Sequence, residues 1–215
     1  MKEGRHILLR DKREIILHDD IILQNDNAIL ISILLEGNTI YSYPIAYPSG
    51  GYGGGTMLLS LSEQYLLFSY YSGQSEEAYI LLRIRDSYLE SVYESGYLCG
   101  EGASYVFSED ENYLFQALPA SLGSWYVDEN AQMDENKTPY FQYGEINMLH
   151  IGNKEVKKHS LNVYPSWNWD EDMAEAEPFY ISAVADQFLS LAMPWGEIKL
   201  EFPLQDIIVL TSKTA

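Results

Sequence analysis

Polar turns and short apolar runs alternate along this chain. The segment NDNAILISILLEGNTIYSYPI shows the pattern first, with two runs rich in isoleucine, leucine and tyrosine on either side of a polar break. The break is formed by Glu36, Gly37 and Asn38. Glycine and asparagine accept the positive φ angles that tight turns require, so the segment predicts a β-hairpin.

Four further segments repeat the pattern, and each has a break that contains glycine or proline: SEQYLLFSYYSGQSEEAYILLRI, SEDENYLFQALPASLGSWYVDE, GEINMLHIGNKEVKKHSLNVY and ADQFLSLAMPWGEIKLEFPL. The first strands of the five hairpins are expected to open near Ala28, Tyr65, Tyr113, Ile146 and Phe188. The breaks are expected near Gly37, Gly73, Pro119, Gly152 and Pro194. Alternating strands leave no room for long helices, so at most a short helix is expected in the acidic segment Asp170–Phe179.

The first strands recur at intervals of about forty residues, which is the period of propeller blades. Three patches, SEQYLLFS, SEDENYLFQ and VADQFLSLA, place a polar cluster before an aromatic residue and an aliphatic run. They resemble the turn that leads into an inner strand of β-propeller repeat proteins. The resemblance implies an all-β fold of repeated antiparallel hairpins, propeller-like with about five units. The alternatives are a β-sandwich or a large curved antiparallel sheet.

Composition agrees with a folded, strand-rich protein. Apolar residues make up 47% of the 215 residues and charged residues 21%, which are values typical of globular domains. The 18 tyrosines outnumber the 13 lysines and arginines, and aromatic residues favour strands. We therefore expect a single all-β domain that spans residues 1–215.

The formal net charge of −19 narrows the choice of partner. Nucleic acids and anionic membranes are bound through lysine and arginine, so this charge disfavours both. It favours a basic protein as the partner. The other interpretation is that the charge serves only to keep the protein soluble.

Cysteine content and the first residues indicate a location. Cys99 is the only cysteine, so no intrachain disulfide can form, and a reducing compartment fits best. The first twenty residues mix charges of both signs and do not resemble a signal peptide. The longest apolar stretch, Ala28–Leu35, is far shorter than the roughly 20 residues of a membrane span. We expect a soluble, cytoplasmic protein.

The glycine-rich stretch SGGYGGGT raises the question of phosphate binding. Gly50 and Gly55 have the spacing of a phosphate-binding loop, but Thr56 stands where such a loop needs lysine. The residues that follow alternate like a strand, so the helix N-terminus that would hold the anion is also missing. The stretch is expected to turn the chain and to allow close backbone approach, with Tyr52 exposed at its tip.

Other chemistry has little support in the sequence. His6, His18, His150 and His159 are scattered and do not have the spacing of a zinc site. Cys99 has no recognisable catalytic partner, and a structural thiol is the simpler interpretation. No cofactor, metal ligand or catalytic residue is predicted, and a non-enzyme is favoured.

Aromatic residues beside acids mark the candidate binding surface. Trp and Tyr side chains supply contact area at low entropic cost, and carboxylates beside them can pair with lysine or arginine of a partner. Two segments combine these residues: Trp125, Tyr126, Asp128 and Glu129, and Trp167, Trp169, Asp170, Glu171 and Asp172. The competing interpretation places Trp167 and Trp169 in the core, since residues two apart in a strand point to the same side.

These observations favour a non-enzymatic acidic protein-binding module. One specific form is an immunity protein that masks a cationic toxin such as a nuclease. The alternative is a carbohydrate-binding or glycoside-hydrolysing β-protein, in which tryptophans stack on sugars and two carboxylates about 5 to 10 Å apart act as acid and base.

Overall fold

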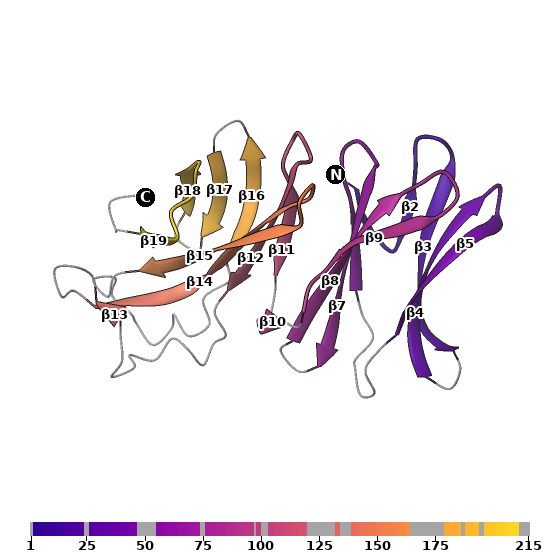
Figure 1. The fold of residues 1–215 in the computed structure, drawn as a ribbon, viewed down its shortest axis with the longest axis horizontal. Coiled ribbons are helices and arrows are strands. Elements are labelled where there is room, and N and C mark those ends of the chain that lie inside the picture. The colour runs from indigo at the N-terminus through magenta and orange to yellow at the C-terminus, as the bar shows by residue number, and fades with distance from the viewer. Residues whose placement is uncertain are drawn as a thin grey trace. The chain divides into compact units, whose positions relative to one another are not determined.

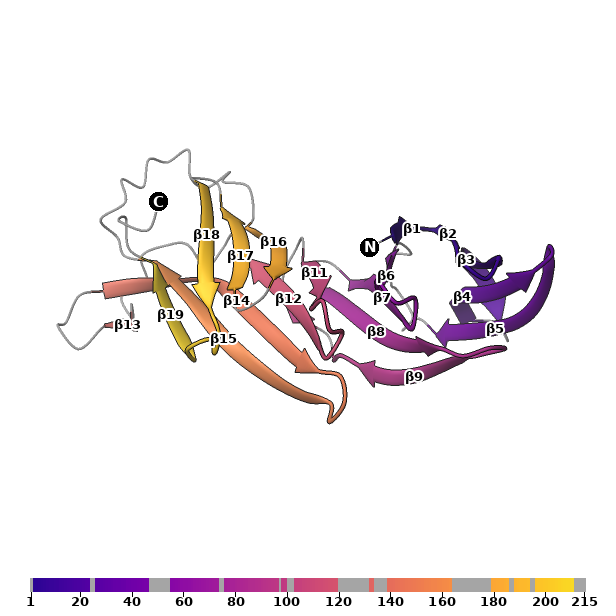
Figure 2. The ribbon, with the colours of Figure 1, turned by 90° about the horizontal axis from the view of Figure 1, so that it is seen from above.

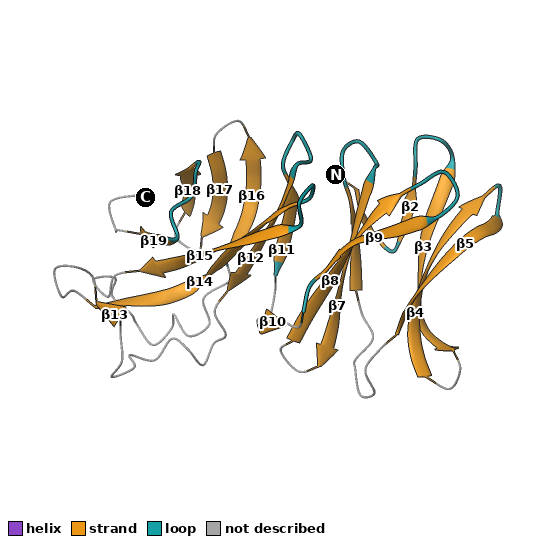
Figure 3. Cartoon of the chain, viewed as in Figure 1, coloured by secondary structure: helices purple, strands orange, loops and turns teal. Residues whose placement is uncertain are grey.

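The computed structural model describes residues 2–23, 26–46, 55–73, 76–96, 98–99, 103–119, 132–133, 139–163, 179–185, 188–193 and 196–210. Strands hold most of these residues and helices none (Figure 3). The prediction of an all-β protein is confirmed. The described residues contain no helix with the length and hydrophobicity of a membrane span.

The chain divides into two compact units, Met1–Cys99 and Gly100–Ala215, and each is described by itself. The expectation of one domain over residues 1–215 stays a prediction. The predicted short helix in Asp170–Phe179 falls almost wholly outside the described residues.

One sheet of the first unit is a four-stranded antiparallel meander (Figure 1). Its strands are β2 (His6–Leu8), β3 (Arg13–Leu23), β4 (Asp26–Leu35) and β5 (Asn38–Ala46). Glu36 and Gly37 connect β4 to β5 with φ angles of 52° and 76°. Two successive positive φ angles are typical of a hairpin turn that matches the strand twist, so the first predicted hairpin is confirmed.

The second sheet of this unit has six strands. They are β1 (Lys2–Gly4), β6 (Gly55–Leu59), β7 (Tyr65–Gly73), β8 (Glu76–Ile84), β9 (Leu89–Glu94) and β10 (Leu98–Cys99). Gly73 pairs with Glu76, so β7 and β8 form the second predicted hairpin with its break at the expected place. The side chain of Cys99 lies outside the described residues.

Apolar side chains from the two sheets form one core in the first unit. Ile15, Ile31 and Ile33 of the first sheet pack in the same cluster as Met57 and Phe68 of the second, and all five are fully buried. Alternation along the strands points one set of side chains of each sheet to this cluster. The two sheets therefore lie face to face within the unit (Figure 2).

The larger sheet of the second unit contains β11 (Ser104–Phe107), β12 (Tyr113–Pro119), β13 (Gln132–Met133), β14 (Pro139–His150), β15 (Glu155–Val163) and β19 (Ile207–Leu210). A three-stranded sheet contains β16 (Tyr180–Ala185), β17 (Phe188–Met193) and β18 (Gly196–Glu201). The β14–β15 hairpin breaks at residues 151–154 and the β17–β18 hairpin between Met193 and Gly196. Both breaks are where the sequence predicts them. Buried residues from both sheets form the core of this unit.

The third predicted hairpin is described only in its first strand. β12 ends at Pro119 as expected, but it pairs with β11 on one edge and with β14 on the other. The second strand of the predicted hairpin is the segment Ser124–Glu129. That segment lies outside the described residues.

The same turn is built once in each unit, ahead of β7 and of β12. In SLSEQY, the Ser60 amide donates to the Tyr65 carbonyl oxygen at 3.0 Å and the Tyr65 amide donates to Ser60 Oγ at 3.1 Å. In SEDENY, the corresponding distances between Ser108 and Tyr113 are 2.9 and 3.0 Å. The fourth residue of each turn is a glutamate in the left-handed region, with φ of 63° and 55°. Two of the three patches of the propeller resemblance therefore share one geometry.

Only Gly55 and Thr56 of the glycine-rich stretch are described. Gly55 bears on whether this stretch binds phosphate or turns the chain. A methyl group on Gly55 would lie 2.5 Å from the Ser69 carbonyl oxygen and 2.6 Å from Phe68 Cζ. The residue begins β6, so strands follow it and not a helix. The close backbone approach expected for this stretch is present at Gly55, and the Phe68 ring lies beside it as well.

Gly55→Ala is expected to lower the free energy of unfolding by about 1 to 3 kcal/mol or more, because the new methyl group must displace backbone or a buried ring. Gly96→Ala is the matched control, since a methyl group there meets open space. Urea unfolding of both full-length variants measures the difference. Equal midpoints would contradict the steric argument.

Candidate functional site

The residues predicted to form the binding surface all lie outside the described residues: Tyr52, Trp125, Tyr126, Asp128, Glu129, Trp167, Trp169, Asp170, Glu171 and Asp172. Their role as a binding surface stays a prediction. The second unit, however, contains a pocket made of other residues.

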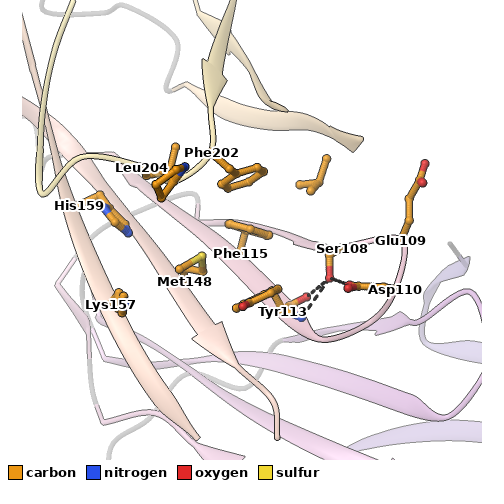
Figure 4. Close-up of a pocket in the computed structure, with 12 residues that line it drawn as sticks. Ser108, Glu109, Asp110, Tyr113, Phe115, Met148, Lys157, His159, Phe202 and Leu204 are labelled. Atoms are coloured by element: carbon orange, nitrogen blue, oxygen red, sulfur yellow. Dashed lines mark hydrogen bonds between the residues drawn. The ribbon is translucent and has the colours of Figure 1, made fainter. Parts of the chain in front are cut away.

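This pocket has a volume of about 570 Å³. It opens over one face of β12, β14 and β15, and the connection from β18 to β19 closes another side (Figure 4). Its lining residues are Ser108, Glu109, Asp110, Tyr113, Phe115, Met148, Lys157, His159, Val184, Phe202, Pro203 and Leu204. The antiparallel register explains part of the set, because Phe115, Met148 and Lys157 lie in one row across the three strands.

The centre of the pocket is apolar and aromatic. Phe115 is 1% exposed, and its ring centroid lies 5.5 Å from that of Phe202 and 6.2 Å from that of Tyr113. Met148 lies beside Phe115 on the next strand. Such a wall accepts an apolar or aromatic group, and the methionine side chain can adapt to its shape.

One side of the pocket is an acidic turn. Asp110 Oδ1 accepts hydrogen bonds from Ser108 Oγ at 2.7 Å and from the Asn112 amide at 3.1 Å. Asp110 Oδ2 accepts another from Asn112 Nδ2 at 2.6 Å. The hydrogen bond from Ser108, followed by those from Asn112, lowers the pKa of Asp110 below its ordinary value of 3.8. Asp110 and its neighbour Glu109 are both exposed, so two carboxylates stand at this rim.

The opposite side carries nitrogen atoms. His159 is 2% exposed, and its Nδ1 lies 2.8 Å from the Gln205 carbonyl oxygen. A carbonyl oxygen only accepts hydrogen bonds, so Nδ1 carries a hydrogen and Nε2 of the neutral ring is an acceptor. Nε2 is buried and has no hydrogen-bond partner among the described residues. Lys157, two residues earlier on the same face of β15, is exposed at the rim.

The pocket therefore has two chemically different sides. Figure 4 shows Glu109 and Asp110 on one side and Lys157 and His159 on the other. The aromatic centre lies between them. A ligand that spans the pocket would meet carboxylates at one end and a hydrogen-bond acceptor with an ammonium group at the other.

The two carboxylates of the pocket rim lie side by side in one turn. The two carboxylates come from adjacent positions of one turn and do not face each other across the pocket. The oxygens of Asp110 are already engaged by Ser108 and Asn112. Among the described lining residues there is no opposed pair of carboxylates, which the glycoside-hydrolysing alternative requires. Within the described part of the chain, no cluster of histidine, cysteine or carboxylate side chains could hold a metal ion.

The first unit shows how the arginines are used. Arg13 pairs with Asp11 at 2.6 Å, Arg85 with Glu90 at 2.7 Å, and Arg10 with Glu63 at 3.6 Å. Arg13 Nη1 also donates to the carbonyl oxygens of Arg85 and Asp86, at 2.6 and 2.8 Å. These guanidinium groups make contacts inside the first unit. The chain as a whole keeps its excess of carboxylates over lysines and arginines.

Sequence reasoning did not find this pocket. The acidic turn had a signal, since SEDENYLF places acids directly before Tyr113 and Phe115 in the same way as the tryptophan segments. His159 had no signal, because a single histidine in a strand does not reveal that its Nε2 is buried. Residues 202–204 come from a connection that lies far along the chain.

Comparison of the chain with protein-family models, with curated proteins and with solved structures gives no match. Function is therefore argued from the site alone.

Asp110→Asn is expected to lower the free energy of unfolding at neutral pH, with a deficit that shrinks as the pH falls below about 4. A carboxyl whose folded-state pKa is lowered contributes stability above its unfolded-state pKa, and that contribution is lost as the pH falls through the lowered value. Urea unfolding between pH 2 and pH 7 measures the deficit, with Glu109→Gln as the control for loss of a neighbouring charge. A deficit of the same size at every pH would contradict the assignment.

Proposed function

We propose that the protein is a non-enzymatic acidic binding module whose partner is a basic protein, and that one specific form of it is an immunity-type inhibitor. The chain has 32 aspartates and glutamates against 13 lysines and arginines, so most carboxylates cannot have a cation of their own within the chain. The arginine pairs of the first unit use part of that small supply. An excess of this kind attracts cationic proteins and speeds their association.

The observation that carries the proposal is the acidic rim beside the aromatic pocket. Binding hot spots combine an apolar anchor site with charges at its edge. Here Glu109 and Asp110 stand at the edge, and Phe115 and Phe202 form the anchor site.

The carboxylates of this rim are not required by the turn. In the corresponding turn of the first unit, Leu61 and Ser62 occupy the places of Glu109 and Asp110. There Ser62 Oγ accepts a hydrogen bond from the Gln64 amide at 3.2 Å, which is the bond that Asp110 accepts from Asn112. Because a serine oxygen accepts the same amide hydrogen bond in the first unit, the geometry of the turn does not require a carboxylate at this position.

We also propose that the sheets correspond to propeller-like units. Three four-stranded antiparallel meanders support this: β2–β5, β6–β9, and β11, β12, β14 and β15. The shared turn before β7 and β12 supports it as well, because its serine and its left-handed glutamate recur at matching positions.

Capture from the native host by the immobilised full-length protein tests the binding function. At about 50 mM salt we expect a partner of high isoelectric point, and at about 500 mM salt we expect most of it to be released, because screening weakens exposed ion pairs. The control variant is Glu197→Gln, a single charge removed away from the pocket on an exposed position of β18. Recovery of only neutral or acidic partners, or capture that is insensitive to salt, would contradict the proposal.

A further inference from the structure

We propose that the pocket of the second unit binds a hydroxyl-bearing aromatic cation, that is, a phenol ring joined to an ammonium or guanidinium group. Two sources supply this chemistry: a tyrosine beside lysine or arginine in a basic protein, or a free aromatic amine. The inference rests on the proposed function in one respect, because it names the group that the acidic module recognises.

The size and walls of the pocket fit an aromatic ring. A volume of about 570 Å³ lies within the range of small-molecule sites. Phe115 and Phe202 offer ring faces and edges for offset or edge-to-face contacts, and Met148 offers a thioether. A ring placed here would be removed from water on several sides.

The hydroxyl group of the proposed ligand is inferred from His159 and Lys157. Nε2 of His159 is a buried acceptor without a partner among the described residues, so it calls for a donor from the ligand. The Lys157 ammonium, on an exposed side chain two residues earlier on the same face of the strand, only donates. A hydroxyl can donate to Nε2 and accept from Lys157. A carboxylate has no hydrogen for Nε2, and an ammonium group would be repelled by Lys157.

The positive charge of the proposed ligand is inferred from the acidic rim on the opposite side of the pocket. Glu109 and Asp110 are exposed there, and none of the ion pairs among the described residues involves either one. The hydrogen bonds from Ser108 and Asn112 fix the Asp110 carboxylate at the rim (Figure 4). A cation at this end would complete a ligand whose hydroxyl lies at the other end.

Titration of the full-length ¹⁵N-labelled protein with four probes tests the inference. The probes are tyramine, phenethylamine, and the capped tripeptides Lys-Tyr-Lys and Lys-Phe-Lys. We expect each phenol to bind at least about tenfold more tightly than its analogue without the hydroxyl, since that analogue leaves Nε2 unpaired. Tighter binding of the peptide identifies a partner's tyrosine as the source, and tighter binding of tyramine identifies a free amine. Equal binding of the phenols and their analogues, or no binding of any probe, overturns the inference.

Variants place the binding in the pocket. His159→Asn keeps a side-chain donor near the Gln205 carbonyl oxygen but removes Nε2, so the preference for phenols should fall to about twofold or less. Lys157→Met should weaken binding of the phenols, whereas Lys158→Met, an exposed position on the opposite face of β15, should not. If His159→Asn does not fold, the two exposed lysine positions still decide. Equal affinities in Lys157→Met and Lys158→Met overturn the inference.

A matched pair of variants tests the acidic rim. Glu109→Gln should weaken binding of all four probes by about threefold or more, while Glu197→Gln should leave it within about twofold. If the protein captures a basic partner in a salt-sensitive way but binds none of these probes, the proposed function stands and this inference alone is overturned. If the protein binds the probes but captures no basic partner, this inference stands and the proposed function is overturned.

Discussion

Side chains alternate across each antiparallel strand, and in this chain both sets are often apolar. β8 shows the constraint most clearly, because Tyr79, Ile80, Leu81 and Leu82 are consecutive and all buried. A sheet with two apolar faces must be covered on both, which favours sheets stacked face to face over a single open sheet. Several charged residues lie in the turns, such as Arg10, Asp11 and Asp110. The separation of an apolar interior from charged turns is the basis of the rest of the account.

The pocket forms where those two regions meet in the second unit. Phe115 and Met148 belong to the buried face of the larger sheet, whereas Glu109 and Asp110 belong to the turn at its end. The corresponding turns of the two units differ in the side chains beside them. Tyr65 pairs across the ladder with Arg83, whose guanidinium lies 5.3 Å from the Tyr65 ring centroid, and Tyr113 pairs with His150 at 5.0 Å between rings. The same framework thus carries different side chains, and the carboxylate pair is found only in the second of the two turns.

Much of the fold could be predicted because its signals are local. Glycine and proline breaks located the hairpins at Gly37, Gly73, Gly152 and Pro194, since turn chemistry acts over a few residues. The partner of β12 could not be predicted in the same way. β14 follows after a long connection, and strand pairing across such a distance leaves no mark on either strand. The pocket was missed for the same reason, since its turn, strands and closing connection meet only in the folded chain.

The central claim is that Nε2 of His159, a buried acceptor without a partner among the described residues, pairs with the hydroxyl of a phenol bound in the pocket. Long-range ¹H–¹⁵N correlation spectra of the imidazole rings test it directly, with the His159 signals assigned by their loss in His159→Asn. We expect the neutral ring in the free protein to carry its hydrogen on Nδ1 and none on Nε2, and we expect tyramine to shift the Nε2 resonance while phenethylamine leaves it nearly unchanged. A hydrogen on Nε2 in the neutral ring, or an Nε2 resonance that ignores both amines, would contradict the account.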